Sequence, residues 1–195
     1  DGLKVLKKAK ADVIVALGGG SVIDTAKAIA IIKENKEHAD VLSLAGAVET
    51  KNRCFPLIAI PTTSGTAAEV TINYVITDEN AKRKLVCIDP HDVPIMSIVD
   101  SELMRTMPAS LTASTGMDAL THAIETLITK GATDMSDMFA LEAIRTIARY
   151  LERAYKNGDD LEAREKMAYA QYVDGMGFSN VGLAIVNSMA HALGG

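Results

Sequence analysis

The segment MDALTHAIE, residues 117–125, places an aspartate and a histidine four positions apart in an otherwise apolar run that favours a helix. On a helix, Asp118 and His122 project from one face about one turn apart, which suits two ligands of the same cation. A carboxylate oxygen together with an imidazole nitrogen favours a divalent ion such as iron or zinc over calcium. The alternative is a polar strip that faces solvent, because Glu125 and Thr129 continue the same face.

The chain has four histidines, and one other lies in a helix-favouring run. His191, in NSMAHALGG, lies on a second apolar helix, where a lone histidine is more often a hydrogen-bonded core residue than a ligand. His38 and His91 lie in polar, loop-like contexts, and no role is assigned to them. The residues alone therefore identify one histidine with a partner at metal-ligand spacing.

A second kind of chemistry is indicated by the glycine run in VIVALGGGSVIDTAKAIAII. An apolar strand over residues 12–17 leads into three glycines, and Ser21 then begins a helix. Glycines let a phosphate approach the backbone, and the free N–H groups at a helix N-terminus favour an anion. Ser21 and Asp24 also resemble a capping box. Because the spacing matches neither G-x-G-x-x-G nor the P-loop, a capped turn without a ligand is the alternative.

Another loop of this kind follows the strand expected over residues 56–61. Residues 62–68 are all small, with Gly65 among them, so the loop can pack closely on a flat or charged ligand and offer hydroxyl and backbone donors. Taken alone, it could be a wide turn. Two such loops after two strands of one α/β unit favour a ligand, because ligands collect outside the carboxyl ends of the strands in these sheets.

The elements that position these residues change character near residue 105. Before it, turns and one amphipathic helix alternate with five β-branched runs, at residues 12–17, 56–61, 71–77, 84–89 and 95–100. After it, Ala, Met and Leu recur at helical spacing in four segments. We therefore predict an α/β domain over residues 1–106 and a helical domain over residues 107–195, with the ligand site in the cleft between them.

Composition and charge argue against several other functions. With 48% hydrophobic and 23% charged residues, the 195-residue chain can bury a sizeable core. Acidic residues outnumber basic ones, 25 to 20, and no basic cluster is interleaved with aromatics, so we expect no nucleic-acid partner. We expect no membrane segment either, because no run reaches about 18 apolar residues. Cys54 and Cys87 lie far apart without C-x-x-C spacing, which indicates reduced thiols and a cytoplasmic protein.

Five segments together carry a resemblance to a known family: GGGSVIDTAKA, IPTTSGTAAEVT, KRKLVCIDPHDVP, MPASLTASTGMDALTHAIE and GMGFSNVGLAIVNSMAHALGG. They resemble the iron-containing (group III) alcohol dehydrogenases, and within them the lactaldehyde reductase (1,2-propanediol oxidoreductase) branch. The resemblance covers the whole chain. It implies a Rossmann-like nucleotide-binding part without its first strands, followed by an all-helical metal-binding part without its last helices, in the architecture shared with dehydroquinate synthase. Since family members are longer, it also implies an internal fragment.

The resemblance implies a site for NAD(P) in the α/β part. The residues that would hold the pyrophosphate or support its loop are Gly19, Gly20, Ser21 and Asp24. Those that would contact the nicotinamide side of the cofactor and its ribose are Thr62, Thr63, Thr66 and Lys84. All of these residues except Lys84 follow the two strand-to-loop junctions described above.

The resemblance also implies an iron(II) site, with zinc as an alternative, in the helical part. Asp118 and His122 match the first two ligands, and Asn187 stands where the family has a histidine. A neutral amide oxygen is a poorer donor to iron or zinc than an imidazole nitrogen. The fourth ligand of the family falls beyond Gly195. His191 matches a histidine beside the nicotinamide that would orient the reactants or relay protons.

The implied function is an NAD(P)- and metal-dependent oxidoreductase that interconverts small primary alcohols or diols and aldehydes. The full-length protein would be a cytoplasmic homodimer. Two alternatives stay open. One is a non-catalytic nucleotide-binding or assembly module in which Asn187 marks a degraded metal site. The other is a lyase such as the related dehydroquinate synthase, which also pairs NAD with a metal.

Overall fold

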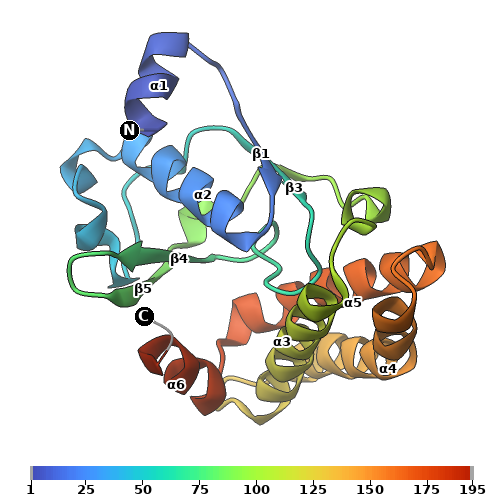
Figure 1. The fold of residues 1–195 in the computed structure, drawn as a ribbon. Helices are drawn as coiled ribbons and strands as arrows, with labels where there is room; N and C mark the ends of the chain where they lie inside the picture. The colour runs from blue at the N-terminus through green and yellow to red at the C-terminus, as the bar shows by residue number, and fades with distance from the viewer. Residues whose placement is uncertain (1, 194–195) are drawn as a thin grey trace.

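The structure is a computed structural model that describes residues 2–193, and the chain passes through an α/β half and then a helical half (Figure 1). The helices of the first half are α1 (Gly2–Ala9) and α2 (Gly20–Glu34), with the short 3-10 helices η1 (Lys36–His38), η2 (Val41–Leu44), η3 (Pro90–Asp92) and η4 (Ser101–Met104). Its strands are β1 (Ile14–Gly18), β2 (Gly46–Ala47), β3 (Leu57–Pro61), β4 (Asn73–Asp78), β5 (Arg83–Ile88) and β6 (Met96–Ser97). The five predicted strands are confirmed, and β2 is an additional one.

The strands form two three-stranded sheets rather than one. In the first sheet, β1, β3 and β6 run parallel with β3 in the centre, and the register places Gly18 opposite Pro61. In the second, β5 lies between β4, which is antiparallel to it, and β2, which is parallel. The register of the first sheet makes the loops after β1 and β3 begin side by side, and the Thr62 amide donates to the Gly18 carbonyl at 2.9 Å.

The helical half consists of α3 (Ala109–Ile128), α4 (Asp134–Lys156), α5 (Leu161–Val181) and α6 (Ile185–Leu193). Small side chains let the first three of these helices approach closely around one core, which comprises Ala119, Ala123, Ala143, Ile147, Ala154, Ala163, Met167 and Ala170. Short loops join α3 to α4 and α4 to α5, so α3 and α5 run parallel. Two hydrogen bonds confirm the parallel direction. Near the start of both helices, Arg164 of α5 donates to Thr112 of α3, and near their ends Thr129 donates to the Val181 carbonyl.

The loop after β3 is packed between the two halves. A Cβ added to Gly65 would lie 2.7 Å from the Cβ of Thr115 on α3, and a Cβ added to Gly175 on α5 would lie 2.5 Å from the Cβ of Ala67. Gln171 of α5 accepts a hydrogen bond from the Ala67 amide at 2.8 Å. These close contacts need glycine at both positions, and they fix the loop where the α/β half meets the helices.

Both cysteines of the described chain are free, in agreement with the predicted reduced thiols. Burial raises the pKa of the Cys54 and Cys87 thiols to about 11 each, so both stay protonated at neutral pH. None of the helices within residues 2–193 combines the length and the apolar character needed to cross a bilayer.

Candidate functional site

A cavity of about 620 Å³ lies where the two halves meet. On the α/β side, its lining includes Asp24 on α2, Thr66 in the loop after β3, and residues of the β4–β5 hairpin. On the helical side, it includes Asp118 and His122 on α3 and Asn187 on α6, the helix that lies beside the hairpin in Figure 1. One cavity therefore collects residues predicted for the cofactor and residues predicted for the metal.

Asp118 and His122 lie one turn apart on the cavity side of α3. The His122 Nε2 is 3.5 Å from the Asp118 Oδ1, and the Phe178 ring packs on the imidazole with the ring centroids 4.7 Å apart. His122 is buried and Glu125 is only 1% exposed, so the alternative of a solvent-facing strip is wrong. The expected orientation of His122 toward the cleft between the halves is confirmed.

Glu125 has a role that its place in the sequence did not indicate. Its carboxylate accepts hydrogen bonds from the Ala184 and Val186 amides at 3.1 and 2.6 Å, and from the Asn187 Nδ2 at 2.7 Å. Burial raises the pKa of Glu125, but the bond from the Asn187 side chain and those from the backbone amides outweigh it, so the pKa lies below its ordinary value. Glu125 thus anchors the start of α6 and orients Asn187.

The side chains at the cavity fit part of a divalent-metal site. Asp118 and His122 supply an oxygen and a nitrogen, and the bond from Asn187 Nδ2 to Glu125 leaves the Asn187 Oδ1 as a third donor. Within the described residues, no three His, Cys, Asp or Glu side chains are arranged to hold a metal ion. His191 belongs to α6, but its side chain lies outside the described part of the structure, so its role stays a prediction.

The glycine loop lies directly against the threonine-rich loop. Gly19 is the N-cap of α2 and Gly20 is its first residue, and no side chain caps this helix. The capping box between Ser21 and Asp24 is therefore wrong. A Cβ added to Gly20 would lie 2.8 Å from the Thr66 Oγ1, so a side chain here would meet the neighbouring loop. A helix N-terminus without a side-chain cap, beside a second small-residue loop, is suited to a phosphate.

The other predicted cofactor residues are not equally close to the cavity. Thr66 is exposed and belongs to its lining, whereas the half-buried Thr62 and Thr63 do not. Thr63 instead faces the glycine loop, since a Cβ added to Gly19 would lie 3.3 Å from its Cγ2. Lys84 is exposed on β5 and does not belong to the cavity lining. The structure thus brings the two loops together but leaves Lys84 apart from the cavity.

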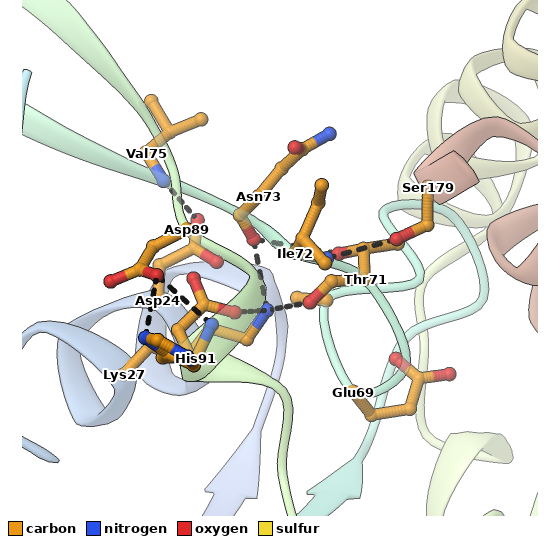
Figure 2. A network of polar contacts seen from close by, with 12 residues as sticks. Asp24, Lys27, Glu69, Thr71, Ile72, Asn73, Val75, Asp89, His91 and Ser179 are labelled. Atoms are coloured by element: carbon orange, nitrogen blue, oxygen red, sulfur yellow. Dashed lines mark hydrogen bonds and ion pairs between the residues drawn. The ribbon is translucent and has the colours of Figure 1, made fainter. Parts of the chain in front are cut away.

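Asp24 forms a hydrogen bond with the second sheet and does not support the glycine loop as predicted. Its Oδ2 accepts a hydrogen bond from the Val75 amide of β4 at 3.0 Å (Figure 2). Burial raises the pKa of Asp24 to about 6, although the Val75 bond and the positive charge of Lys27 act in the opposite direction. Asp24 therefore connects the helix that follows the glycine run to the strand that lines the cavity.

Lys27, one turn after Asp24, is a buried cation that sequence reasoning missed. Its Nζ lies 3.3 Å from the Asp92 Oδ1 and donates to the carbonyls of Thr71 and Asn73 at 2.5 and 2.9 Å (Figure 2). Thr71 and Asn73 both line the cavity. The only signal in the sequence was a lysine on the apolar face of a helix, and that signal does not identify partners 44 and 46 residues away.

Known proteins match both halves. Residues 1–101 match a family model described as iron-containing alcohol dehydrogenase, and residues 112–195 match one described as Fe-containing alcohol dehydrogenase family, C-terminal. Lactaldehyde reductase of Escherichia coli K12 is 54% identical over 194 residues, which cover 100% of this chain and 50% of the relative. NAD-dependent methanol dehydrogenase of Bacillus methanolicus is 47% identical over 195 residues, which cover 100% of this chain and 51% of the relative.

The fold is also shared with solved structures. The crystal structure of 1,3-propanediol oxidoreductase matches with a TM-score of 0.93 at 46% identity, over 100% of this chain and 50% of that chain. The predicted fold class, a Rossmann-like α/β part followed by helices, is confirmed by this likeness. In each comparison the chain spans about half the length of the protein that it matches.

Proposed function

Because this chain belongs to the iron-containing alcohol dehydrogenase family, we propose that the protein containing it is an NAD(P)- and iron-dependent oxidoreductase. It interconverts a small primary alcohol or diol and the corresponding aldehyde. The observation that carries the proposal is the single cavity lined by Thr66 of the threonine-rich loop and by the Asp118–His122 pair. The names of two relatives, lactaldehyde reductase and NAD-dependent methanol dehydrogenase, support a small substrate and NAD.

In this proposal the metal is held by Asp118 Oδ1, His122 Nε2 and Asn187 Oδ1. When bound, a divalent iron supplies Lewis-acid polarisation of the substrate oxygen. The residues present orient these donors: Phe178 packs on the His122 ring, and Glu125 holds the Asn187 amide. Buried partners of this kind restrict the rotation of a ligand and so preserve the geometry of a site.

The cofactor in this proposal lies along the junction of the two loops, with its pyrophosphate at Gly19, Gly20 and Ser21. When bound, the nicotinamide supplies hydride chemistry. Thr66 lies between the glycine run and the cavity, because it approaches Gly20 and also belongs to the cavity lining. We propose that Thr62 and Thr63 support this side of the cofactor and that Lys84 acts only near its ribose.

The substrate in this proposal occupies the cavity beside the metal pair. Apolar side chains of both halves line it, namely Val75, Val86, Ile88, Phe178 and Leu183. Such a lining holds a short alkyl chain and displaces water from the reacting carbon. We also propose that His191 relays the proton, and that the full-length protein is a cytoplasmic homodimer.

The decisive test uses the complete protein, loaded with iron(II) under nitrogen. NADH formation from propane-1,2-diol is followed by absorbance, together with metal analysis of the same sample. We expect turnover that depends on added iron. Dinucleotide binding without iron binding or turnover would instead support the non-catalytic module, the alternative that Asn187 favours because it replaces an imidazole donor. Turnover of a phosphate-eliminating lyase substrate, but of no alcohol, would support the dehydroquinate synthase-like reading.

A further inference from the structure

Asp174 on α5 is a buried carboxyl that the proposed function does not use. It is 1% exposed, and neither of its oxygens has a hydrogen-bond partner among the described residues. A buried carboxylate without donors or a counter-charge costs several kcal/mol, so proteins retain one mainly where a ligand or a cation compensates it. The arrangement therefore leaves a carboxyl whose ionised form has no hydrogen bond to balance it among the described residues.

The parallel course of α3 and α5 places Asp174 beside the metal pair. Phe178, one turn after Asp174, packs on the ring of His122, and His122 lies one turn after Asp118. Asp174 therefore lies opposite Asp118 across the helix interface. The pKa of Asp174 is raised to about 8, first by burial and then by the negative charge of Asp118, which agrees with this proximity.

The cationic side chains that approach this region from other elements already have partners. Lys27 of α2 is paired with Asp92, and Arg164 of α5 donates to Thr112 and to the Met107 carbonyl. The acidic Glu69 of the loop after β3 accepts a hydrogen bond from Gln171. On α3, the His122 Nδ1 is buried and has no hydrogen-bond partner within the described part of the chain. The region thus carries two carboxyls and a histidine, with no protein cation assigned to balance them among the described residues.

We propose that Asp174 supplies a second negative charge to the divalent-cation site of Asp118 and His122, and so offsets the neutral Asn187. The inference rests on the metal site of the proposed function. Asp174 acts on the cation through space and through Asp118, so it is a positioning residue and not a ligand. A negative charge this close raises the affinity for divalent ions in general, because the low dielectric of the interior screens it little.

The test measures Mn²⁺ affinity of the complete, chelator-treated protein by electron paramagnetic resonance at pH 7.5. We expect Asp174→Asn and Asp174→Ala to weaken Mn²⁺ binding by about tenfold or more, and Asp174→Glu to preserve most of the affinity. Asp137→Asn is the matched control, because one Asp137 oxygen is also buried without a partner among the described residues, but Asp137 lies in the first turn of α4 and not on α3 or α5. It should leave the affinity unchanged.

Thermal unfolding gives a second readout that a purely structural role would not reproduce. Without a cation, Asp174→Asn should raise the Tm, because an isosteric amide removes the unpaired acid. The rise in Tm on adding Mn²⁺ should become smaller in the same variant. A higher Tm with unchanged Mn²⁺ affinity in both neutral variants would overturn the inference. If the unsubstituted protein binds no Mn²⁺ or iron at all, the proposed function itself is overturned; binding that Asp118→Ala abolishes and Asp174→Asn leaves intact overturns only the role of Asp174.

Discussion

The two sides of the cavity are constructed differently. The proposed cofactor side consists mainly of backbone: β1 and β3 in parallel register, a glycine run at the start of α2, and a loop of small residues packed against it. The proposed metal side consists of side chains on three helices, and Asn187 is oriented by hydrogen bonds from its backbone amide and its Nδ2 to Glu125. A backbone site tolerates many substitutions as long as the fold persists, whereas a side-chain site can be altered by one. The departure that the resemblance implies, Asn187 in place of a histidine, falls on the proposed metal side.

The largest effect is expected from removing the metal pair. His122→Ala should lower alcohol oxidation by the iron-loaded complete protein by about a thousandfold or more, since it removes a nitrogen ligand and the ring that Phe178 packs on. Dinucleotide binding should change little, because the cofactor side does not depend on this side chain. The control is His38→Ala, because His38 is a half-buried histidine in the α/β half that contacts Ser43 and lies outside the cavity lining. If both substitutions leave the rate unchanged, the assignment of the metal side is wrong.

Glu125→Gln tests how far the metal side depends on one buried anion. An amide at this position presents N–H groups to the donors of Ala184, Val186 or Asn187, so we expect the free energy of unfolding to fall by about 2–5 kcal/mol. Metal retained after dialysis should fall as well. Glu162→Gln is the matched control, because Glu162 is an exposed carboxylate paired with Arg153 and should matter little. Equal denaturation midpoints for the two variants would contradict the anchoring role.

Asn187→His tests whether the family arrangement can be restored. One imidazole nitrogen can donate to Glu125, as the Asn187 Nδ2 does, which leaves the other nitrogen for the metal. We expect the iron or zinc affinity of the complete protein to rise at least about tenfold, with a parallel gain in alcohol oxidation. The measurement is metal stoichiometry after dialysis, with and without the substitution. Tight stoichiometric metal in the unmodified protein would show that Asn187 is an adequate donor.

On the cofactor side, a single side chain added to the glycine run should have a smaller effect. Gly20→Val directs a β-branched side chain at Thr66 and into the space proposed for the phosphate, so we expect dinucleotide affinity to fall about tenfold while the fold persists. Titration of NADH fluorescence measures this loss. Thr25→Val, which adds an apolar β-branched residue on the exposed side of the same helix, is the control. Equal affinities would remove the glycine run from the site.

The same contrast explains what could be predicted from the sequence. Alternating β-branched runs and glycine punctuation are local signals, so the strands β1, β3, β4 and β5 and the two small-residue loops were found within a few residues of their observed bounds. The two-residue strand β2 has no local pattern, because it exists only through pairing with Cys87 and Ile88 of β5. This pairing helps to divide the strands into two sheets, which no single segment could reveal.

The sequence also could not predict which charged groups are buried. Spacing placed Asp118 and His122 on one face of a helix, and the structure keeps them together. For Glu125, however, the same spacing suggested exposure, because its partners begin 59 residues later in the chain. The capping box predicted for Ser21 and Asp24 is wrong for a related reason. A carboxylate near the start of a helix is expected to accept from nearby amides, but Asp24 accepts from Val75, a strand residue 51 positions away. Local patterns identify elements, whereas long-range contacts decide which polar groups are buried.

The smallest expected effect concerns Asp24, the carboxyl that connects α2 to the second sheet beside the cavity. Its pKa in the folded protein is about 6, above the ordinary value of 3.8, because burial disfavours the charged form. A raised folded-state pKa stabilises the fold fully below about pH 4, and this contribution is lost as the pH rises through about 6. Asn at this position can still accept the Val75 hydrogen bond and does not ionise. We therefore expect Asp24→Asn to match the unmodified protein near pH 4 and to exceed it in Tm by a few degrees at pH 7.

Thermal unfolding across pH 4–8 measures this difference, and Asp78→Asn serves as the control. Asp78 lies at the end of β4. Its carboxylate accepts hydrogen bonds from the Asn80 and Ala81 amides in the turn that follows the strand, so it forms a local contact rather than a long-range one. Asp174, whose pKa is raised to about 8 by burial and Asp118, keeps its own pH dependence in both proteins. The pKa of Asp92 is raised to about 7, mainly by burial, and the charge of Asp24 adds to this rise, so it should fall slightly in the variant. The main gain from Asp24→Asn should therefore level off above pH 6. A gain that continues to grow above that pH would show that the folded-state pKa of Asp24 is higher still. A loss of stability at pH 7 would show that the ionised Asp24 is stabilised in the fold. The charge of Lys27 would then outweigh the cost of burial, and this side of the cavity would depend on side-chain charges as much as the metal side does.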